Sequence, residues 1–122
     1  MNEIEKELKN AEERLSTARL LLENQRYEDV VSRAYYSMFH AAKALLLTKN
    51  SSPRTHSGIA SELGKLFREE LGKELTSKFV TIQQLREEAD YGVESSINTE
   101  RAKEVVNNSE KFLSRAKEII ES

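Results

Sequence analysis

The residues of this chain that could take part in chemistry are few, and they fall on three separate stretches. The first stretch holds Arg33, Tyr36 and His40. Arg33 and His40 are seven residues apart, which on a helix places them on one face and about 10 Å apart along the axis. A cation, a phenol and an imidazole on one face could bind an anion or move a proton. The alternative is an ordinary helix surface that carries a partly buried, hydrogen-bonded tyrosine.

The second stretch, residues 54–57, contains His56. Thr55 or Ser57 is a suitable N-cap for a helix that begins here. The unpaired backbone N–H groups at a helix start favour anions, so His56 would stand beside an anion-binding position. The alternative is a capping turn with an exposed histidine.

The third stretch places Arg86 four residues before Asp90, with Tyr91 and Gly92 following. We expect Asp90 to be buried and to pair with Arg86, Arg33 or both, because a neighbouring arginine keeps a buried carboxyl group charged. The alternatives are a helix-surface ion pair, which contributes only a few tenths of a kcal/mol, and a C-cap at Gly92 with Tyr91 packing at the helix end.

We predict that these polar side chains form one binding site if the three stretches converge. Its members would be Arg33, Tyr36, His40, His56, Arg86, Asp90 and Tyr91. We predict no metal site and no cofactor, because the chain has two histidines and no cysteine, no glycine-rich phosphate loop and no zinc or di-iron motif. A nucleophile triad has no candidate either.

The composition indicates a single domain with a highly charged surface. The chain has 122 residues, of which 38% are hydrophobic and 33% charged, and its formal net charge is −2. This charge gives no general attraction for nucleic acid or membranes, although residues 26–55 carry five Lys and Arg against two acids. The N-terminus is unlike a signal peptide, and no apolar run approaches the roughly 20 residues that cross a membrane. We therefore expect a cytoplasmic protein.

The stretch from residue 32 to residue 47 must position most of these side chains, and it has the pattern of a central helix. It contains no Gly or Pro, and its apolar residues cover much more than a narrow seam. A helix of this kind is touched by neighbours on several sides. The residues that we expect to be buried are Ala34, Met38, Phe39, Ala41 and Leu45; the polar strip left over would hold Arg33, Ser37 and His40, with Tyr36 beside it.

The remaining segments also have helical patterns. We predict helices over residues 2–24, from near Tyr27 to about Leu47, from about residue 55 to Gly72, over about residues 74–89, and from Asn98 or Thr99 onward. A loop over residues 49–58 holds Pro53, which we expect to stop the central helix. A loop from Val93 to Asn98 would precede the last helix. No segment shows the alternation of a strand. The sequence therefore predicts an all-α, up-and-down antiparallel bundle of about five helices in one domain, residues 1–122.

Residues 32–42, 56–59 and 85–92 together resemble the HEPN family, and more closely its small stand-alone archaeal and bacterial members of unassigned function. The resemblance covers about residues 5–120. It implies a helical bundle that often dimerises, association with nucleotides or RNA, and a partnership with a minimal nucleotidyltransferase in a toxin–antitoxin module. Many members of the family are metal-independent ribonucleases that use an arginine, a following polar residue and, a few residues later, a histidine.

This chain departs from the ribonuclease pattern, because no histidine follows Arg86 and Asp90 stands near its place. An aspartate with a pKa near 3.9 is a poor proton donor at neutral pH. Arg33 and His40 match the spacing alone, but on a different helix. Our leading hypothesis is therefore a binding module, a nucleotide- or RNA-associated partner of a nucleotidyltransferase. The alternatives are a weak endoribonuclease that uses Arg33, His40 or His56, and a purely structural helical homodimer.

We also expect a homodimer whichever hypothesis holds, because the apolar stripes exceed what one layer of neighbours in a small bundle covers.

Overall fold

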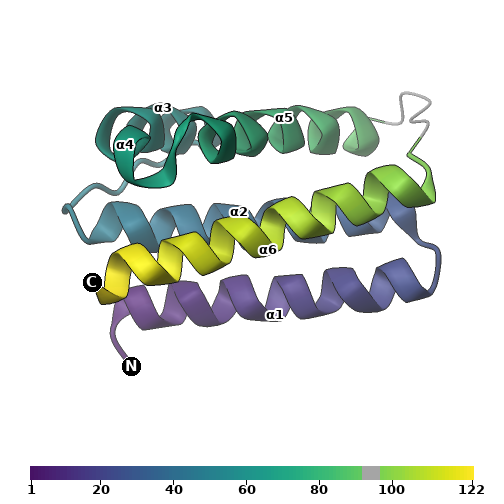
Figure 1. Ribbon diagram of the computed structural model, residues 1–122, viewed down its shortest axis with the longest axis horizontal. Coiled ribbons are helices and arrows are strands. Elements are labelled where there is room, and N and C mark those ends of the chain that lie inside the picture. Colours follow the sequence, from purple (N-terminus) through teal and green to yellow (C-terminus); the bar gives the residue numbers. More distant parts are fainter. Residues whose placement is uncertain (92–96) are drawn as a thin grey trace.

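The computed structural model describes residues 1–91 and 97–122, and these residues form six helices and no strand. They are α1 (Glu3–Glu23), α2 (Tyr27–Leu47), α3 (His56–Leu66), α4 (Arg68–Leu71), α5 (Lys73–Asp90) and α6 (Thr99–Glu121). Figure 1 shows three tiers, with α1 on one side, α2 and α6 in the middle, and α3, α4 and α5 on the other side. The predicted all-α antiparallel bundle is confirmed.

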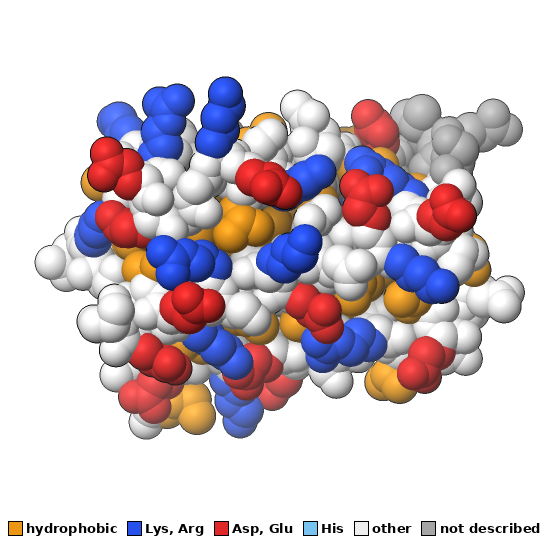
Figure 2. Space-filling view, in the orientation of Figure 1, with side chains coloured by type: hydrophobic (Ala, Val, Ile, Leu, Met, Phe, Trp, Pro, Cys, Tyr) orange, Lys and Arg blue, Asp and Glu red, His pale blue; other side chains and the backbone are white. Residues whose placement is uncertain are grey.

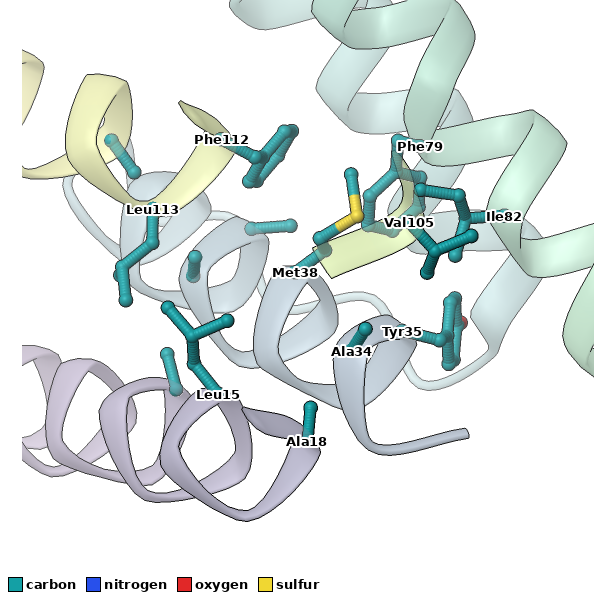
Figure 3. Close-up of a cluster of buried hydrophobic side chains, with 14 of the residues drawn as sticks. Leu15, Ala18, Ala34, Tyr35, Met38, Phe79, Ile82, Val105, Phe112 and Leu113 are labelled. Carbon is teal, nitrogen blue, oxygen red and sulfur yellow. The ribbon is translucent and has the colours of Figure 1, made fainter. Parts of the chain in front are cut away.

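Helix α2 is the centre of the bundle, as the sequence predicts. It packs against α1, α3, α5 and α6, and eleven of its 21 residues are buried. Figure 3 shows Met38 of α2 pointing toward Phe79 of α5, while Leu15 of α1 and Leu113 of α6 lie on the other side. The burial of apolar side chains on several faces of one helix is what holds the four long helices together.

Two details of α2 differ from the prediction. Ser37 is not on a polar strip but fully buried, where its hydroxyl donates a hydrogen bond of 2.8 Å to the backbone oxygen of Ala11 in α1. The small side chain lets the two helices approach, and the bond satisfies the hydroxyl. Phe39 is only half-buried, because its ring lies at the edge of the core between the side chains of His40 and His56.

The ends of α1 and α2 are set by residues with left-handed backbone geometry. Gln25 has a φ of 58° and Asn50 a φ of 57°. After each helix the chain turns back, and a backbone N–H donates a hydrogen bond to the carbonyl five residues earlier. After α2 this bond runs from Ser51 to Leu46, at 2.9 Å. Helix α2 therefore ends at Leu47, in agreement with the loop predicted from Lys49, but the turn at Asn50 ends it, and not Pro53 as predicted.

A break at Phe67 divides the predicted third helix into α3 and the short α4. Phe67 is buried and leaves the helical region with a φ of −127°. The chain then turns at Gly72, whose φ of +85° is a conformation that side chains other than glycine rarely adopt. The number of helices is therefore one more than predicted, within the described residues.

The start of α6 follows the prediction, since the side chain of Asn98 accepts a hydrogen bond of 2.8 Å from the backbone N–H of Arg101. The predicted loop from Val93 and the predicted cap at Gly92 fall on residues 92–96, which lie outside the described residues. Over the described part of the chain, no helix has the length and apolar character that a bilayer crossing needs.

The burial of the phenylalanines gives a direct test of where the core ends. We expect Phe79→Ala to lower the free energy of unfolding by roughly 3–5 kcal/mol, because Phe79 is fully buried. Phe39→Ala should cost clearly less, because its ring is half-exposed. Urea denaturation followed by circular dichroism measures both values, and equal losses for the two variants would contradict this boundary of the core.

Candidate functional site

Arg86 of α5 is the centre of a polar cluster that also includes two tyrosines of α2. Its guanidinium carbon lies 5.1 Å from the ring centroid of Tyr35 and 5.4 Å from that of Tyr36. One terminal nitrogen, Nη1, donates hydrogen bonds of 3.0 Å to the hydroxyl of Tyr36 and to the carboxylate of Asp90. The side chain is only 16% exposed. The aromatic faces favour the cation, and the helices hold it in one place.

The hydrogen-bonding capacity of Arg86 is only partly used by the described residues. Its Nε is buried and has no partner among them. Within the described part of the chain, Nη2 makes no hydrogen bond either, since both bonds of the guanidinium leave from Nη1. A guanidinium matches the geometry of a phosphate or carboxylate with two donors. Because Nε is enclosed by the protein, Nη2 is the donor of Arg86 that is left for an anionic ligand.

His56 reaches the same cluster from the start of α3. The hydroxyl of Thr55 caps this helix by accepting a hydrogen bond of 2.9 Å from the backbone N–H of Gly58. A Cβ at Gly58 would stand 2.8 Å from that hydroxyl, so the tight capping turn requires glycine. The turn presents the His56 ring to Phe39 at a centroid distance of 4.6 Å and to Tyr35 at 5.8 Å, stacked in both cases.

A short hydrogen bond joins His56 to the core, because its Nδ1 lies 2.7 Å from the hydroxyl of Tyr35. Burial raises the pKa of Tyr35, so its phenol stays protonated. Burial and the nearby charge of Arg86 lower the pKa of His56, so its ring is neutral at pH 7. Two tautomers fit this contact: the phenol donates to Nδ1 and the ring carries its hydrogen on Nε2, or Nδ1–H donates to the phenol oxygen.

His40 belongs to a neighbouring ion-paired group rather than to the Arg86 cluster. Its Nδ1 lies 2.9 Å from one carboxylate oxygen of Glu7 in α1, and Nζ of Lys43 lies 3.1 Å from the other. Burial would raise the pKa of Glu7, but the hydrogen bonds and charges of Lys43 and His40 lower it below its usual value. The ring of Phe39 separates this group from His56.

The structure thus brings together four of the predicted site residues, Tyr36, His56, Arg86 and Asp90, and leaves Arg33 and Tyr91 apart. Arg33 is exposed on α2 and forms no hydrogen bond or ion pair with the described residues. Tyr91 is 83% exposed, so it does not pack at the helix end. The expected burial of Asp90 is wrong, because its position at the end of α5 leaves the side chain 47% exposed. The ion pair itself forms as predicted, with 3.0 Å between Nη1 of Arg86 and the carboxylate of Asp90.

Three contributors were not predicted. Tyr35 is one of the apolar-stripe residues of α2, so its position predicts only a core residue. The adjacent Tyr36 is the one indication in the sequence of an aromatic cluster there. Glu7 and Lys43 are ordinary charged residues by pattern, and the packing of α1 on α2 is what joins them to His40.

The arrangement can hold an anion by charge and hydrogen bonds, with an aromatic wall beside it. No group of three or more His, Asp or Glu side chains that could hold a metal ion occurs among the described residues.

Known proteins resemble this chain in both sequence and fold. The model of the HEPN domain matches residues 4–119. The chain is 40% identical over 120 residues, 97% of its length and 89% of the other protein, to Putative toxin MJ0605 of Methanocaldococcus jannaschii. It is 36% identical over 122 residues, 98% and 97% of the two chains, to a UPF0332 protein of Archaeoglobus fulgidus. The fold matches the crystal structure of TT1696 from Thermus thermophilus with a TM-score of 0.83 at 20% identity, over 97% and 98% of the two chains.

The lowered pKa of His56 predicts how stability depends on pH. Below about pH 6.5, the ordinary histidine value, an unfolded chain binds a proton at this residue that the folded chain takes up only at lower pH. The stability that His56 contributes is therefore full above that value and is lost as the pH falls toward the folded-state pKa. Nuclear magnetic resonance titration should give a pKa below 6.5 for His56, and Arg86→Met should raise it by removing the neighbouring charge. A wild-type value at or above 6.5 would contradict the description of this contact.

Proposed function

We propose that this chain, which belongs to the HEPN domain family, is a binding module that holds a phosphate group of a nucleotide or RNA at Arg86. The observation that carries the proposal is the partly unused guanidinium, held between two tyrosine rings and beside a neutral histidine. A cation in such a site attracts phosphate, and aromatic rings stack on bases without regard to sequence.

The charges around Arg86 also support an anionic ligand. Asp90, its carboxylate partner among the described residues, is half-exposed and reaches only Nη1. The carboxylate of Asp90 is open to solvent, so an incoming phosphate could replace it or bind beside it. In the tautomer in which the phenol donates to Nδ1, His56 would offer the ligand its Nε2 hydrogen as a further donor.

The proposal includes a role in a toxin–antitoxin module. Relatives that share 40% and 36% identity with this chain carry the name Putative toxin. The resemblance of the sequence to stand-alone HEPN proteins adds a minimal nucleotidyltransferase as the partner protein. In this proposal the chain binds the nucleic-acid or nucleotide ligand, and the partner controls that binding.

A second function, metal-independent RNA cleavage, is favoured by a histidine near an arginine: burial and then the charge of Arg86 lower the pKa of His56, so its ring is neutral and could accept a proton. Proton transfer by a positioned histidine contributes roughly 10²–10⁴ in rate. However, Nδ1 of His56 is already bonded to Tyr35, and no histidine follows Arg86, where the resemblance to the ribonucleases of the family would place one. We therefore rank binding without cleavage first.

We expect the wild-type protein to bind a short single-stranded RNA and an RNA hairpin, and to leave both intact in EDTA. Arg86→Ala should weaken binding by roughly tenfold or more, because it removes charge-assisted hydrogen bonds to phosphate. Fluorescence anisotropy measures binding, and gel electrophoresis after prolonged incubation measures cleavage.

Arg19→Ala is the matched control, because it removes an exposed arginine of α1 whose partner is Glu110 of α6. Arg86→Met keeps part of the apolar stem against the tyrosines and separates loss of charge from loss of packing. Equal RNA affinity in the wild type and both Arg86 variants would refute the binding proposal. Cleavage that is abolished by His56→Ala, or by His40→Ala, would establish the enzymatic alternative instead.

The proposal also includes a homodimer, although the long apolar stripes predicted from the sequence are covered within one chain. Contacts between copies would use apolar side chains that remain exposed, such as Leu20 and Val80. We expect light scattering at micromolar concentration to give twice the mass of one chain. A mass of one chain would contradict the dimer without touching the ligand proposal.

A further inference from the structure

The surface between α3, α4 and the first half of α5 is hollowed, and this hollow shares no residue with the Arg86 cluster. One wall runs from Ser61 to Arg68 and the other from Lys73 to Val80, and the volume between them is about 680 Å³. Sites that enclose several groups of a ligand occupy roughly 300–1,000 Å³. The hollow is therefore large enough for several side chains of a bound polypeptide, and larger than a single small anion needs.

Three cations line the hollow, and they lie toward one end of it. Lys65 and Arg68 come from the last turn of α3 and the start of α4, and Lys73 is the first residue of α5. Because the short α4 joins the end of α3 to the start of α5, the chain brings these three side chains to the same end of the hollow. Figure 2 shows basic side chains gathered over this part of the molecule, at the upper left of the view.

The positive charge of this end is not neutralised by the described residues. None of the described residues that line the hollow is acidic. Lys65 approaches Glu62, with 3.9 Å between Nζ and a carboxylate oxygen. The side chains of Arg68 and Lys73 form no hydrogen bond or ion pair within the described part of the chain. The hollow therefore attracts a ligand that carries more than one negative charge.

The rest of the hollow has a different character. Ser61 and Ser77 line it with hydroxyl groups that make no hydrogen bond to any described residue, so both can donate or accept one. Val80 also lines it, and its side chain is 40% exposed. A ligand that fills the hollow would thus place anionic groups at one end and polar and apolar groups at the other.

This combination suits a polypeptide better than a nucleic acid. Single-stranded nucleic acids bind where aromatic side chains stack on the bases, and no described residue of the lining is aromatic. A phosphate backbone is negative at every nucleotide, and beyond the hollow it would meet the exposed Glu69 and Glu74. A polypeptide can place carboxylates in the hollow and neutral or basic side chains beside those two glutamates.

We propose that this hollow docks an acidic segment of a partner protein. Carboxylates of that segment pair with Lys65, Arg68 and Lys73, and an apolar side chain of the segment lies against Val80. The guanidinium of Arg68 matches a carboxylate with two donors. The inference goes beyond the phosphate site at Arg86 and does not depend on it, because the two surfaces have no residue in common.

The test uses the full chain and a fluorescently labelled peptide, Glu-Glu-Glu-Ala-Leu-Leu, whose binding is measured by fluorescence anisotropy. The wild type should bind this peptide, and added salt should weaken the binding because the contacts are ionic. A peptide with glutamine in place of glutamate should bind at least about tenfold more weakly. A peptide with serine in place of leucine should bind about fivefold more weakly, because it loses the contact with Val80.

Two double variants of the protein then locate the peptide. Arg68→Gln combined with Lys73→Gln should weaken binding of the acidic peptide by roughly tenfold. The matched control is Lys103→Gln combined with Lys111→Gln, which removes the same net charge from α6, outside the hollow, and should bind the peptide as the wild type does. All four side chains are exposed, so both variants should fold, which circular dichroism checks.

No binding of the acidic peptide, or equal weakening by the two double variants, would overturn the inference. RNA binding that Arg68→Gln with Lys73→Gln weakens, while peptide binding is unchanged, would make the hollow a nucleic-acid site and overturn it too. No peptide binding, together with loss of self-association in that variant by light scattering, would assign the hollow to contacts between copies instead. Arg86→Ala should leave peptide binding unchanged whatever it does to RNA binding, so the two proposals fail separately.

Discussion

The burial of α2 on several sides is the constraint on which the rest of the structure depends. Because α1, α3, α5 and α6 all pack against this helix, only a narrow part of its surface is left for polar side chains. Tyr36, Phe39, His40 and Lys43 lie at spacings of three and four on that part, half-buried rather than free in solvent. Polar side chains of other helices contact this strip, as Arg86 of α5 contacts Tyr36 and Glu7 of α1 contacts His40. The candidate site is therefore a consequence of how completely the rest of α2 is covered. On the face of the molecule in Figure 2, by contrast, positive and negative side chains are interspersed.

Arg86 is the side chain for which this packing has an energetic cost. It is mostly removed from water, its Nε has no partner among the described residues, and its carboxylate neighbour is half-exposed. Burying a charge without a full set of partners lowers stability, and the tyrosine rings offset only part of that loss. An apolar residue in this place would fill the same space without the cost. Residues that break the rules of stable packing are expected at functional sites, where a ligand supplies what the protein leaves out. The argument for an anionic ligand thus comes from an unfavourable contact, whereas the choice of phosphate follows the resemblance to the family.

The sequence was sufficient for the fold and for half of the site. Helical periodicity and the scarcity of Gly and Pro predicted every long helix, because their apolar stripes are continuous. The end of α2 at Leu47 agrees with the loop predicted from Lys49, where Asn50 takes the left-handed conformation that asparagine tolerates after a helix, whereas the break at Phe67 depends on tertiary packing. Arg86, Tyr36 and His56 were predicted as chemically meaningful, but their convergence depends on the angle at which α3 and α5 cross α2. Tyr35 was missed because a tyrosine in an apolar stripe looks like any other core residue, and its hydroxyl becomes informative only when His56 is placed beside it.

The contact between Tyr35 and His56 decides what the site is suited to do. A histidine that serves as a general acid must be protonated, and here burial and Arg86 both oppose protonation. A bound phosphate would cancel the charge of Arg86, yet the burial would remain. A histidine that serves as a general base must offer an unprotonated nitrogen, and Nδ1 is already engaged by the hydroxyl of Tyr35. Nε2 is free to accept a proton in the tautomer in which Nδ1–H donates to the phenol oxygen, and it carries a hydrogen in the tautomer in which the phenol donates to Nδ1. The second tautomer suits the donation of one neutral hydrogen bond to an anion, so which tautomer Tyr35 holds decides between proton transfer and binding.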